Sequence, residues 1–225
     1  MQQIEFLDRL DAEAVQRLRQ RLTESTHQKD EIVISQNDGS RDIFFVLEGT
    51  ARAQGLSGEG KLVSYRDIPQ GAMFGELSAI DGLPRSADVV AVGPLTVGRL
   101  SQTAFRDVMD TDSSFRWTFL TYQTEQCRIM TSRIFEFSTM VMRDRLIGEL
   151  LRMSDGSETG ENRAEISPAP THFELASRIS THREAVSREM SSLSKQNLVT
   201  KQTKTLVIHD LDALRALREA KNGAS

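Results

Sequence analysis

Residues 73–88 read MFGELSAIDGLPRSAD, and this stretch decides how the N-terminal part of the chain is interpreted. Gly75 lets the backbone approach a ligand closely, and a short helix beginning near Glu76 would direct its free N–H groups at an anion. The Arg85 guanidinium can hold a phosphate through two parallel hydrogen bonds, while an ionised Glu76 accepts a hydrogen bond from a sugar hydroxyl. The stretch therefore predicts a site for a phosphate ester.

The sequence around this stretch predicts a β-rich domain. Short β-branched or aromatic runs occur between residue 31 and about residue 100, and Gly, Asn, Asp or Pro separate them: IVI, IFFVL, LVSY, DVVAV and LTVGRL. Such punctuation is typical of many short strands, so we expect a β-sandwich, roll or barrel. Residues 5–22 carry apolar side chains at helical spacing, and Asp11 is suited to cap a second short helix there.

Residues 102–153 contain almost no Gly or Pro, which favours a long helix. Apolar side chains recur along it at intervals close to a heptad, at Leu120, Cys127, Met130, Ile134, Phe137 and Val141. A heptad seam is typical of a helix that pairs with a second copy, so we expect a homodimer. The alternative is a helix that lies along its own β-domain.

The C-terminal part has the pattern of a winged helix. Residues 154–170 are polar and predict a linker, followed by one helix from about Thr171 and a second from about Thr181, its expected cap, to Gln196. The run LVTKQTKTLVIHD then predicts two short strands around a polar turn. The residues expected to pack inward are Leu175, Ala176, Ile179, Val186 and Met190.

The accessible face of the second helix is polar and basic, as a DNA-reading helix requires. Arginine fits the edge of guanine and glutamate can accept from cytosine, so Arg183, Glu184 and Arg188 form the expected reading set. Phosphate contacts are expected from Thr171, His172, Ser187 and either Lys201 or Lys204, and His182 on the accessible face completes the expected DNA-binding set. Residues 171–209 hold six Lys or Arg against three Glu. The alternative is a solvated helix face on which Glu184 pairs with Arg188.

Composition narrows the class of protein. The chain has 225 residues, a formal net charge of −4 and a single cysteine, Cys127, which can form no internal disulfide and cannot supply a metal cluster. No apolar run is long enough for a membrane span or a signal peptide, so we expect a cytoplasmic protein without membrane contact. The histidines are scattered, and no Walker loop, metal-ligand spacing or nucleophile–base pair occurs; we expect no enzyme, catalytic residue, metal or cofactor.

Two motifs resemble a known family. FGEL, followed by Arg nine residues after its Glu, resembles the phosphate-binding cassette of cyclic-nucleotide-binding domains, and Arg183-Glu184-x-Val186-x-Arg188 resembles the recognition helix of the cAMP-receptor branch of the CRP/FNR family. The resemblance implies that Glu76 holds the ribose and Arg85 the phosphate. It further implies that the purine reaches a pair of residues on the long helix. The implied ligand contacts are Gly75, Glu76, Leu77, Ser78, Ala79, Arg85, Ser86, Met130, Thr131 and, if the helix is rotated, Ser132.

The resemblance implies an α+β fold: a jelly-roll-like β-roll with N-terminal helices over residues 1–110, a dimerisation helix over 111–142 and a winged helix-turn-helix over 143–225. It also implies a cAMP-responsive homodimer that binds double-stranded DNA at TGTGA-like palindromes, with RNA polymerase as a further partner. Met130 departs from the Thr of the family pattern, and the Ser86 hydroxyl could meet the amino group of guanine. cGMP is therefore the second expected ligand, and a constitutive DNA binder with a structural β-roll is the alternative function.

Overall fold

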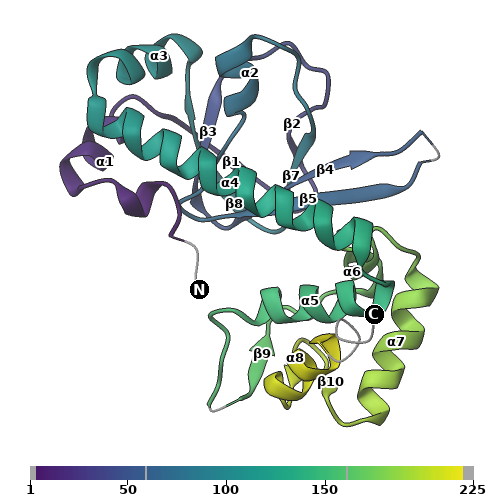
Figure 1. The fold of residues 1–225 in the computed structure, drawn as a ribbon. Coiled ribbons are helices and arrows are strands. Elements are labelled where there is room, and N and C mark those ends of the chain that lie inside the picture. Colours follow the sequence, from purple (N-terminus) through teal and green to yellow (C-terminus); the bar gives the residue numbers. More distant parts are fainter. Residues whose placement is uncertain (1–3, 59, 161, 220–225) are drawn as a thin grey trace. The chain divides into compact units, whose positions relative to one another are not determined.

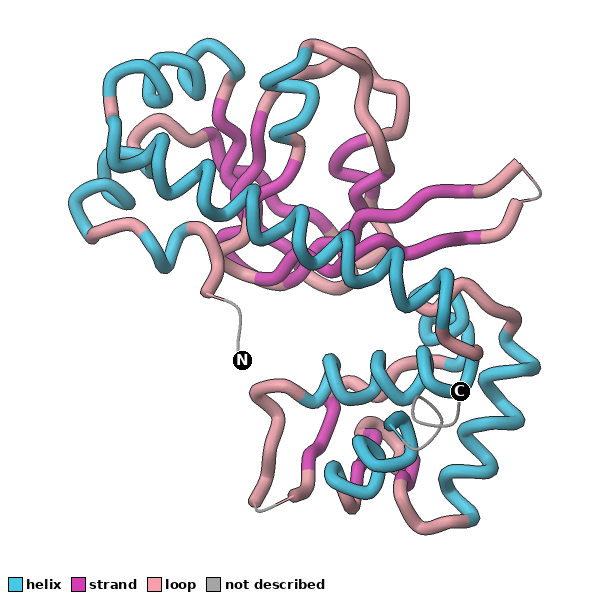
Figure 2. The backbone as a smooth tube through the Cα atoms, viewed as in Figure 1, coloured by secondary structure: helices cyan, strands magenta, loops and turns pink. Residues whose placement is uncertain are grey.

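The computed structural model describes residues 4–58, 60–160 and 162–219. Contacts divide these residues into two compact units, one of residues 4–130 and one of residues 131–219, which are described separately. Figure 2 shows that most strands belong to the first unit, whereas helices dominate the second. The division falls inside the segment 111–142, so the predicted domain boundaries at residues 110 and 142 stay predictions.

The first unit is built on two antiparallel four-stranded sheets, ordered β1-β8-β3-β6 and β2-β7-β4-β5 (Figure 1). Their inner faces form one apolar core, in which the rings of Phe44 and Phe74 stack at 5.2 Å between centroids. The strands are β1 Thr23–His27, β2 Ile32–Ile34, β3 Ile43–Glu48, β4 Thr50–Leu56, β5 Leu62–Pro69, β6 Met73–Phe74, β7 Asp88–Ala91 and β8 Leu95–Leu100.

Strand β3 explains why the run IFFVL has no polar residue. Phe44 and Val46 face the core between the sheets, while Ile43, Phe45 and Leu47 belong to a second core on the other face of their sheet. Successive side chains of a strand point to opposite faces, so a strand buried on both sides must be apolar throughout.

Helices cover that second core. They are the 3-10 helix η1 Leu7–Arg9 and the α-helices α1 Ala12–Arg19, α3 Gln102–Thr111 and α4 Ser113–Thr139; the short α2 Glu76–Asp81 lies in the segment between β6 and β7. Phe6 is completely buried, and its ring centroid lies 5.3 Å from that of Phe115 and 5.7 Å from that of Tyr122, both on α4. Asp11 caps α1 as predicted, because its side chain accepts a hydrogen bond from the Ala14 N–H.

The long helix predicted within residues 102–153 is present as α4, but helical structure over that range is interrupted twice. Asp112 has extended backbone angles after α3, and its carboxylate accepts from the Phe115 N–H at 2.9 Å, which caps the start of α4. Val141 is likewise extended and begins α5 Met142–Ser154. The strands β1, β4 and β6 were also not predicted; the TESTH sequence of β1, for example, is polar, and four of its five side chains are exposed.

The second unit is a winged helix with one strand more than predicted. After α5 come β9 Ala164–Ile166, α6 His172–Arg178, α7 Arg183–Lys195, β10 Val199–Lys201, β11 Leu206–Ile208 and α8 Leu211–Glu219. The strands form one sheet in the order β10-β11-β9, so residues 154–170 are not simply a linker. The predicted inward residues are confirmed, with exposures of at most 7% for Leu175, Ala176, Ile179, Val186 and Met190.

The helix caps of this unit differ in part from the prediction. Thr171 and Glu174 form a capping box: the Thr171 hydroxyl accepts from the Glu174 N–H at 3.1 Å, and the Glu174 carboxylate accepts from the Thr171 N–H at 2.8 Å. Thr181 is not the cap of α7. The N-cap is His182, whose side chain makes no capping hydrogen bond. Thr181 instead belongs to the turn after α6, because Ser180 is left-handed and the Thr181 N–H donates to the Ala176 carbonyl.

Candidate functional site

The segment that follows β6 forms a tight turn around Gly75. Gly75 has a left-handed φ of 83° and precedes the first turn of α2. A Cβ atom at this position would lie 2.8 Å from Arg85 Nη1 and 3.0 Å from the Asp42 carbonyl oxygen. Glycine is therefore required for two reasons, the backbone angle and the close approach of Arg85.

Arg85 is buried, with 3% of its surface exposed, and neutral oxygens hold its guanidinium. Nε donates to Ser40 Oγ at 3.1 Å, Nη1 to the Gly75 carbonyl at 2.7 Å and Nη2 to the Asp42 carbonyl at 2.8 Å. Burial lowers the pKa of Arg85, opposed by the more distant charges of Asp38, Asp42 and Glu76. Within the described residues no carboxylate forms an ion pair with Arg85, so its charge is not neutralised at contact distance.

Glu76 is the first residue of α2 and has 9% of its surface exposed. Its carboxylate makes no hydrogen bond or ion pair with any residue that the structure describes, Arg85 included. Glu76 and Arg85 are thus not a structural ion pair. The Glu76 carboxylate therefore keeps its acceptor capacity for a hydrogen-bond donor on a ligand.

The other predicted cassette residues lie in the same short segment. Ser78 and Ala79 are buried within α2, whereas Leu77 and Ser86 are exposed. The first N–H groups of a helix have no partner within it, so the backbone of residues 76–79 can donate to a ligand. The structure therefore brings together Gly75, Glu76, Leu77, Ser78, Ala79, Arg85 and Ser86.

The three residues predicted to meet a purine lie on α4, and all three are exposed. Met130 belongs to the first unit, while Thr131 and Ser132 belong to the second. Their contribution to ligand binding stays a prediction.

The predicted DNA-reading residues share one surface of the second unit. Arg183, Glu184, Ser187 and Arg188, all from α7, line a hollow of about 340 Å³. In the described part of the chain Glu184 and Arg188 form no ion pair, although they are one helical turn apart. Both charged groups are exposed to solvent, and the alternative in which Glu184 pairs with Arg188 is not observed.

A second hollow, of about 570 Å³, adjoins the first through Arg183. Its lining residues come from three elements: Thr171, His172, Phe173, Arg183 and Lys201. The hairpin of β10 and β11, the wing of the winged helix, thus brings Lys201 to the start of α6. A phosphate-binding role requires this position. Lys204 lies exposed in the turn between β10 and β11, and His182 is exposed at the start of α7; neither lines the two hollows.

Phe173 is the residue of this surface that the sequence analysis missed. It is 56% exposed on the first turn of α6, although a phenylalanine after an N-cap is ordinarily read as a core residue. The sequence does indicate this exposure, because Phe173 lies two residues before the buried Leu175 and residues two apart on a helix face different directions.

The pKa of His172 depends on its basic neighbours. Burial lowers the pKa of the His172 imidazole, and the positive charges of Lys201 and Arg183 lower it further. The ring is therefore neutral at pH 7, and an anion placed in the hollow would favour its protonated form.

The apolar seam predicted on the long helix is exposed on α4. Leu120, Met130 and Ile134 have 47%, 50% and 65% of their surface exposed. Phe137 departs from the seam: it is half-buried, and the guanidinium carbons of Arg133 and Arg145 lie 5.2 and 5.5 Å from its ring centroid. Exposed apolar side chains in this number on one helix indicate a surface that another chain covers.

Models of two domain families match the chain. The cyclic nucleotide-binding domain matches residues 24–112, and the Crp-like helix-turn-helix domain matches residues 144–217. Together they define a regulator that joins a nucleotide-binding roll to a DNA-binding winged helix. The chain belongs to the CRP/FNR family, whose members are transcription regulators rather than enzymes.

Individual relatives are distant in sequence and close in fold. The chain is 21% identical over 178 residues to the cAMP-activated global transcriptional regulator CRP of Salmonella typhimurium, which covers 79% of this chain and 85% of that protein. A CooA mutant from Carboxydothermus hydrogenoformans superposes with a TM-score of 0.81 at 17% identity, covering 97% of each chain. CLP of Xanthomonas campestris, a c-di-GMP responsive global regulator, superposes with a TM-score of 0.77 at 15% identity, covering 88% of this chain and 99% of CLP.

Two negative findings apply to the residues the structure describes. None of their helices is long and apolar enough to cross a membrane. No group of three or more His, Cys, Asp or Glu side chains among them is arranged to hold a metal ion.

Proposed function

We propose that the chain is a cAMP-responsive transcription regulator that binds TGTGA-like palindromes as a homodimer. One observation carries the proposal: Arg85 is buried without a carboxylate partner, in the same segment as a buried Glu76 whose carboxylate has no partner in the described chain. A cyclic phosphate supplies the anion that Arg85 lacks, and a ribose 2′-hydroxyl supplies the donor that Glu76 lacks.

The choice of cAMP over cGMP rests on the likeness to the cAMP-activated CRP. The exposed Ser86 hydroxyl, next to Arg85, is compatible with the amino group of guanine as well, so cGMP is the second ligand to test. The likeness to the c-di-GMP responsive CLP adds a third cyclic nucleotide.

The proposed DNA contacts follow from the two hollows. Arg183, Glu184 and Arg188 reach base edges, while Thr171, His172, Ser187 and Lys201 hold the backbone. His182 and Lys204, which are exposed outside the hollows, complete the proposed DNA contacts. A palindromic site requires two such surfaces, which the exposed seam of α4 would provide by dimerisation. RNA polymerase is proposed as a partner only through the likeness to CRP.

Calorimetry and a DNA titration test the proposal together. Purified protein is titrated with cAMP, cGMP and c-di-GMP, and a fluorescent TGTGA-type palindrome is then titrated with protein in the presence of each nucleotide and without any. We expect cAMP to bind and to raise affinity for the palindrome. Equal operator affinity with and without saturating cAMP would instead favour a constitutive regulator with a structural β-roll.

A further inference from the structure

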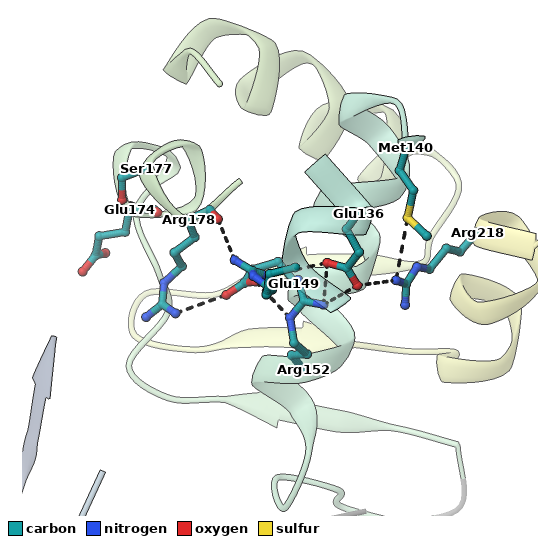
Figure 3. Close-up of polar contacts among 9 residues, drawn as sticks. Glu136, Met140, Glu149, Arg152, Glu174, Ser177, Arg178 and Arg218 are labelled. Atoms are coloured by element: carbon teal, nitrogen blue, oxygen red, sulfur yellow. Dashed lines mark hydrogen bonds and ion pairs between the residues drawn. The ribbon is translucent and has the colours of Figure 1, made fainter. Parts of the chain in front are cut away.

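A cluster of arginines and glutamates joins four helices of the second unit. Figure 3 labels five of its members, which are Glu136 from α4, Glu149 and Arg152 from α5, Arg178 from the end of α6 and Arg218 from α8. The sixth member is Arg133, in the last turns of α4. We call this set the interhelical cluster. All six residues belong to the unit that contains the DNA-reading surface.

Glu149 is the centre of the cluster and is 4% exposed. Its carboxylate accepts hydrogen bonds from Arg133 on α4 at 2.8 Å, from Arg152 on α5 at 2.8 Å and from Arg178 on α6 at 3.1 Å. Burial raises the pKa of Glu149, but the three guanidinium groups outweigh it and hold the pKa below its usual range. Glu149 is therefore an ionised bridge between three helices.

Glu136, on α4, is 7% exposed and adds a fourth helix. It accepts from Arg152 Nη1 at 2.9 Å and from Arg218 Nη2, on α8, at 2.8 Å. Arg152 thus contacts both glutamates of the cluster. The last turns of α4 are in this way attached to α5 and to α8.

Arg133 makes the connection from α4 to the helix-turn-helix itself. Its Nη1 donates to Glu149, and its Nη2 donates to the backbone carbonyl of Arg178 at 2.8 Å. Arg178 is the last residue of α6, where unpaired carbonyls favour a positive charge. The turn from α6 to the reading helix α7 begins directly after this contact.

The connection between α4 and α5 is also fastened. Arg145 Nη1 donates to the carbonyls of Phe137 and Met140 at 3.4 and 3.2 Å, and its guanidinium lies over the Phe137 ring. The turn between these helices is therefore held from both sides, with Arg133 on one and Arg145 on the other. These contacts restrict bending between α4 and α5.

We propose that Arg133 is a positioning residue for DNA reading, which makes the last turns of α4 and the helix-turn-helix move as one body. The inference rests on the proposed function, because it assigns to α4 the transfer of a ligand signal. Buried ion pairs add little net stability over apolar packing, so a cluster of this size is better explained by the geometry that it imposes. The Arg133 guanidinium reaches Glu149 and the Arg178 carbonyl through two different nitrogens of one planar fork, a geometry that the single nitrogen of a lysine does not reproduce.

The test compares Arg133→Lys with Arg215→Lys in the full-length protein. Lysine keeps the charge that Glu149 needs but loses the planar fork. Arg215 is a matched control because it pairs with Asp212 inside α8 and not with a glutamate of the cluster. Operator affinity is measured with and without saturating cAMP, and amide hydrogen exchange is measured in residues 133–139, 172–179 and 211–219. A nucleotide-driven gain for the unaltered protein in the ordinary allosteric range would be about 5- to 150-fold.

We expect Arg133→Lys to reduce this gain at least about fivefold and to speed exchange in residues 133–139 and 172–179, but not in 211–219, while Arg215→Lys changes neither. An unaltered gain in Arg133→Lys, or unaltered exchange in the first two segments, overturns the proposal. If the unaltered protein itself shows no gain, the proposed function fails, and the exchange data still decide whether Arg133 holds α4 to the helix-turn-helix.

Discussion

Arg85 donates through Nη1 to the backbone carbonyl of Gly75 at 2.7 Å, so the glycine that shapes the turn before α2 also fastens the buried guanidinium beside it. The two residues are ten positions apart, and the second hydrogen bond to the Asp42 carbonyl ties both to the start of β3. The cassette is therefore preorganised by backbone oxygens, which leaves the charge of Arg85 available to an anion.

Replacing Arg85 with glutamine is expected to weaken binding of a cyclic nucleotide about 10- to 100-fold, because a hydrogen bond to a charged group contributes about 1.5–3 kcal/mol. Calorimetry with cAMP provides the measurement. Arg41→Gln, at an exposed arginine in the loop before β3, is the matched control and is expected to bind as the unaltered protein does. Unchanged affinity in Arg85→Gln would remove Arg85 from the ligand site.

Alanine at Gly75 is expected to destabilise the protein by about 1–2 kcal/mol through its left-handed backbone alone, with a further loss because the new Cβ would meet Arg85 Nη1. Thermal unfolding and nucleotide calorimetry of Gly75→Ala measure both effects. Gly58→Ala serves as the control, since no atom lies within 4 Å of a Cβ there and Gly58 is not left-handed. Equal melting temperatures for the two variants would contradict the prediction.

On the DNA-reading surface, Arg183→Ala is expected to lose about 1–3 kcal/mol at a guanine-containing palindrome and to relax the preference at that position. Lys204→Ala, in the wing turn, should weaken binding to all sequences alike, because a phosphate contact carries no sequence information. Fluorescence titrations with matched and mismatched palindromes separate the two effects. A uniform loss across sequences in Arg183→Ala would show that Arg183 contacts only the backbone.

Folding stability should depend on pH through His172. Its pKa in the folded protein lies below the ordinary 6.5, so the unfolded chain binds a proton more readily. Above pH 6.5 the imidazole is neutral in both the folded and the unfolded chain, so it does not change the free energy of unfolding. As pH falls from 6.5 towards the lower folded pKa, the unfolded chain binds the proton first and the folded protein loses stability. His172→Gln should remove this part of the acid sensitivity in denaturant unfolding at a series of pH values.

The same histidine should couple DNA binding to proton uptake. A backbone phosphate in the hollow raises the pKa of His172, so affinity for the palindrome should rise as pH falls through this window. NMR titration of the ring gives a direct check, in which Lys201→Gln is expected to raise the pKa because it removes one of the neighbouring positive charges. An unchanged titration in Lys201→Gln would show that the two residues do not interact.

A charge in the exposed seam of α4 should prevent dimerisation. Ile134→Glu places a carboxylate at a side chain that is 65% exposed, whereas Thr121→Glu places one at an exposed position off the seam. Light scattering after size-exclusion chromatography is expected to give a monomer for the first variant and a dimer for the second. A dimer in both would move the interface away from this seam.

Local motifs predicted much of the fold and of both candidate surfaces. The apolar periodicity of residues 175–190 identified the buried side of the helix-turn-helix, and short apolar runs located five of the eight strands in the first unit. Sequence patterns failed at Asp112, where a carboxylate that caps the next helix interrupts an apolar periodicity, and in β1, where pairing with the distant strand β8 makes a strand of a polar sequence.

The sequence by itself determined which residues are predicted to bind a phosphate ester, the glycine that must lie at the turn, and the spacing of the arginines predicted to read DNA, since these depend on chemistry within a few residues of chain. Tertiary structure alone decided that Arg85 is held by Ser40 and Asp42, that Lys201 joins His172, and that Arg133 bridges Glu149 and Arg178. These pairs of residues lie 16 to 45 positions apart in the sequence, and only the folding of separate helices and strands against one another brings them together.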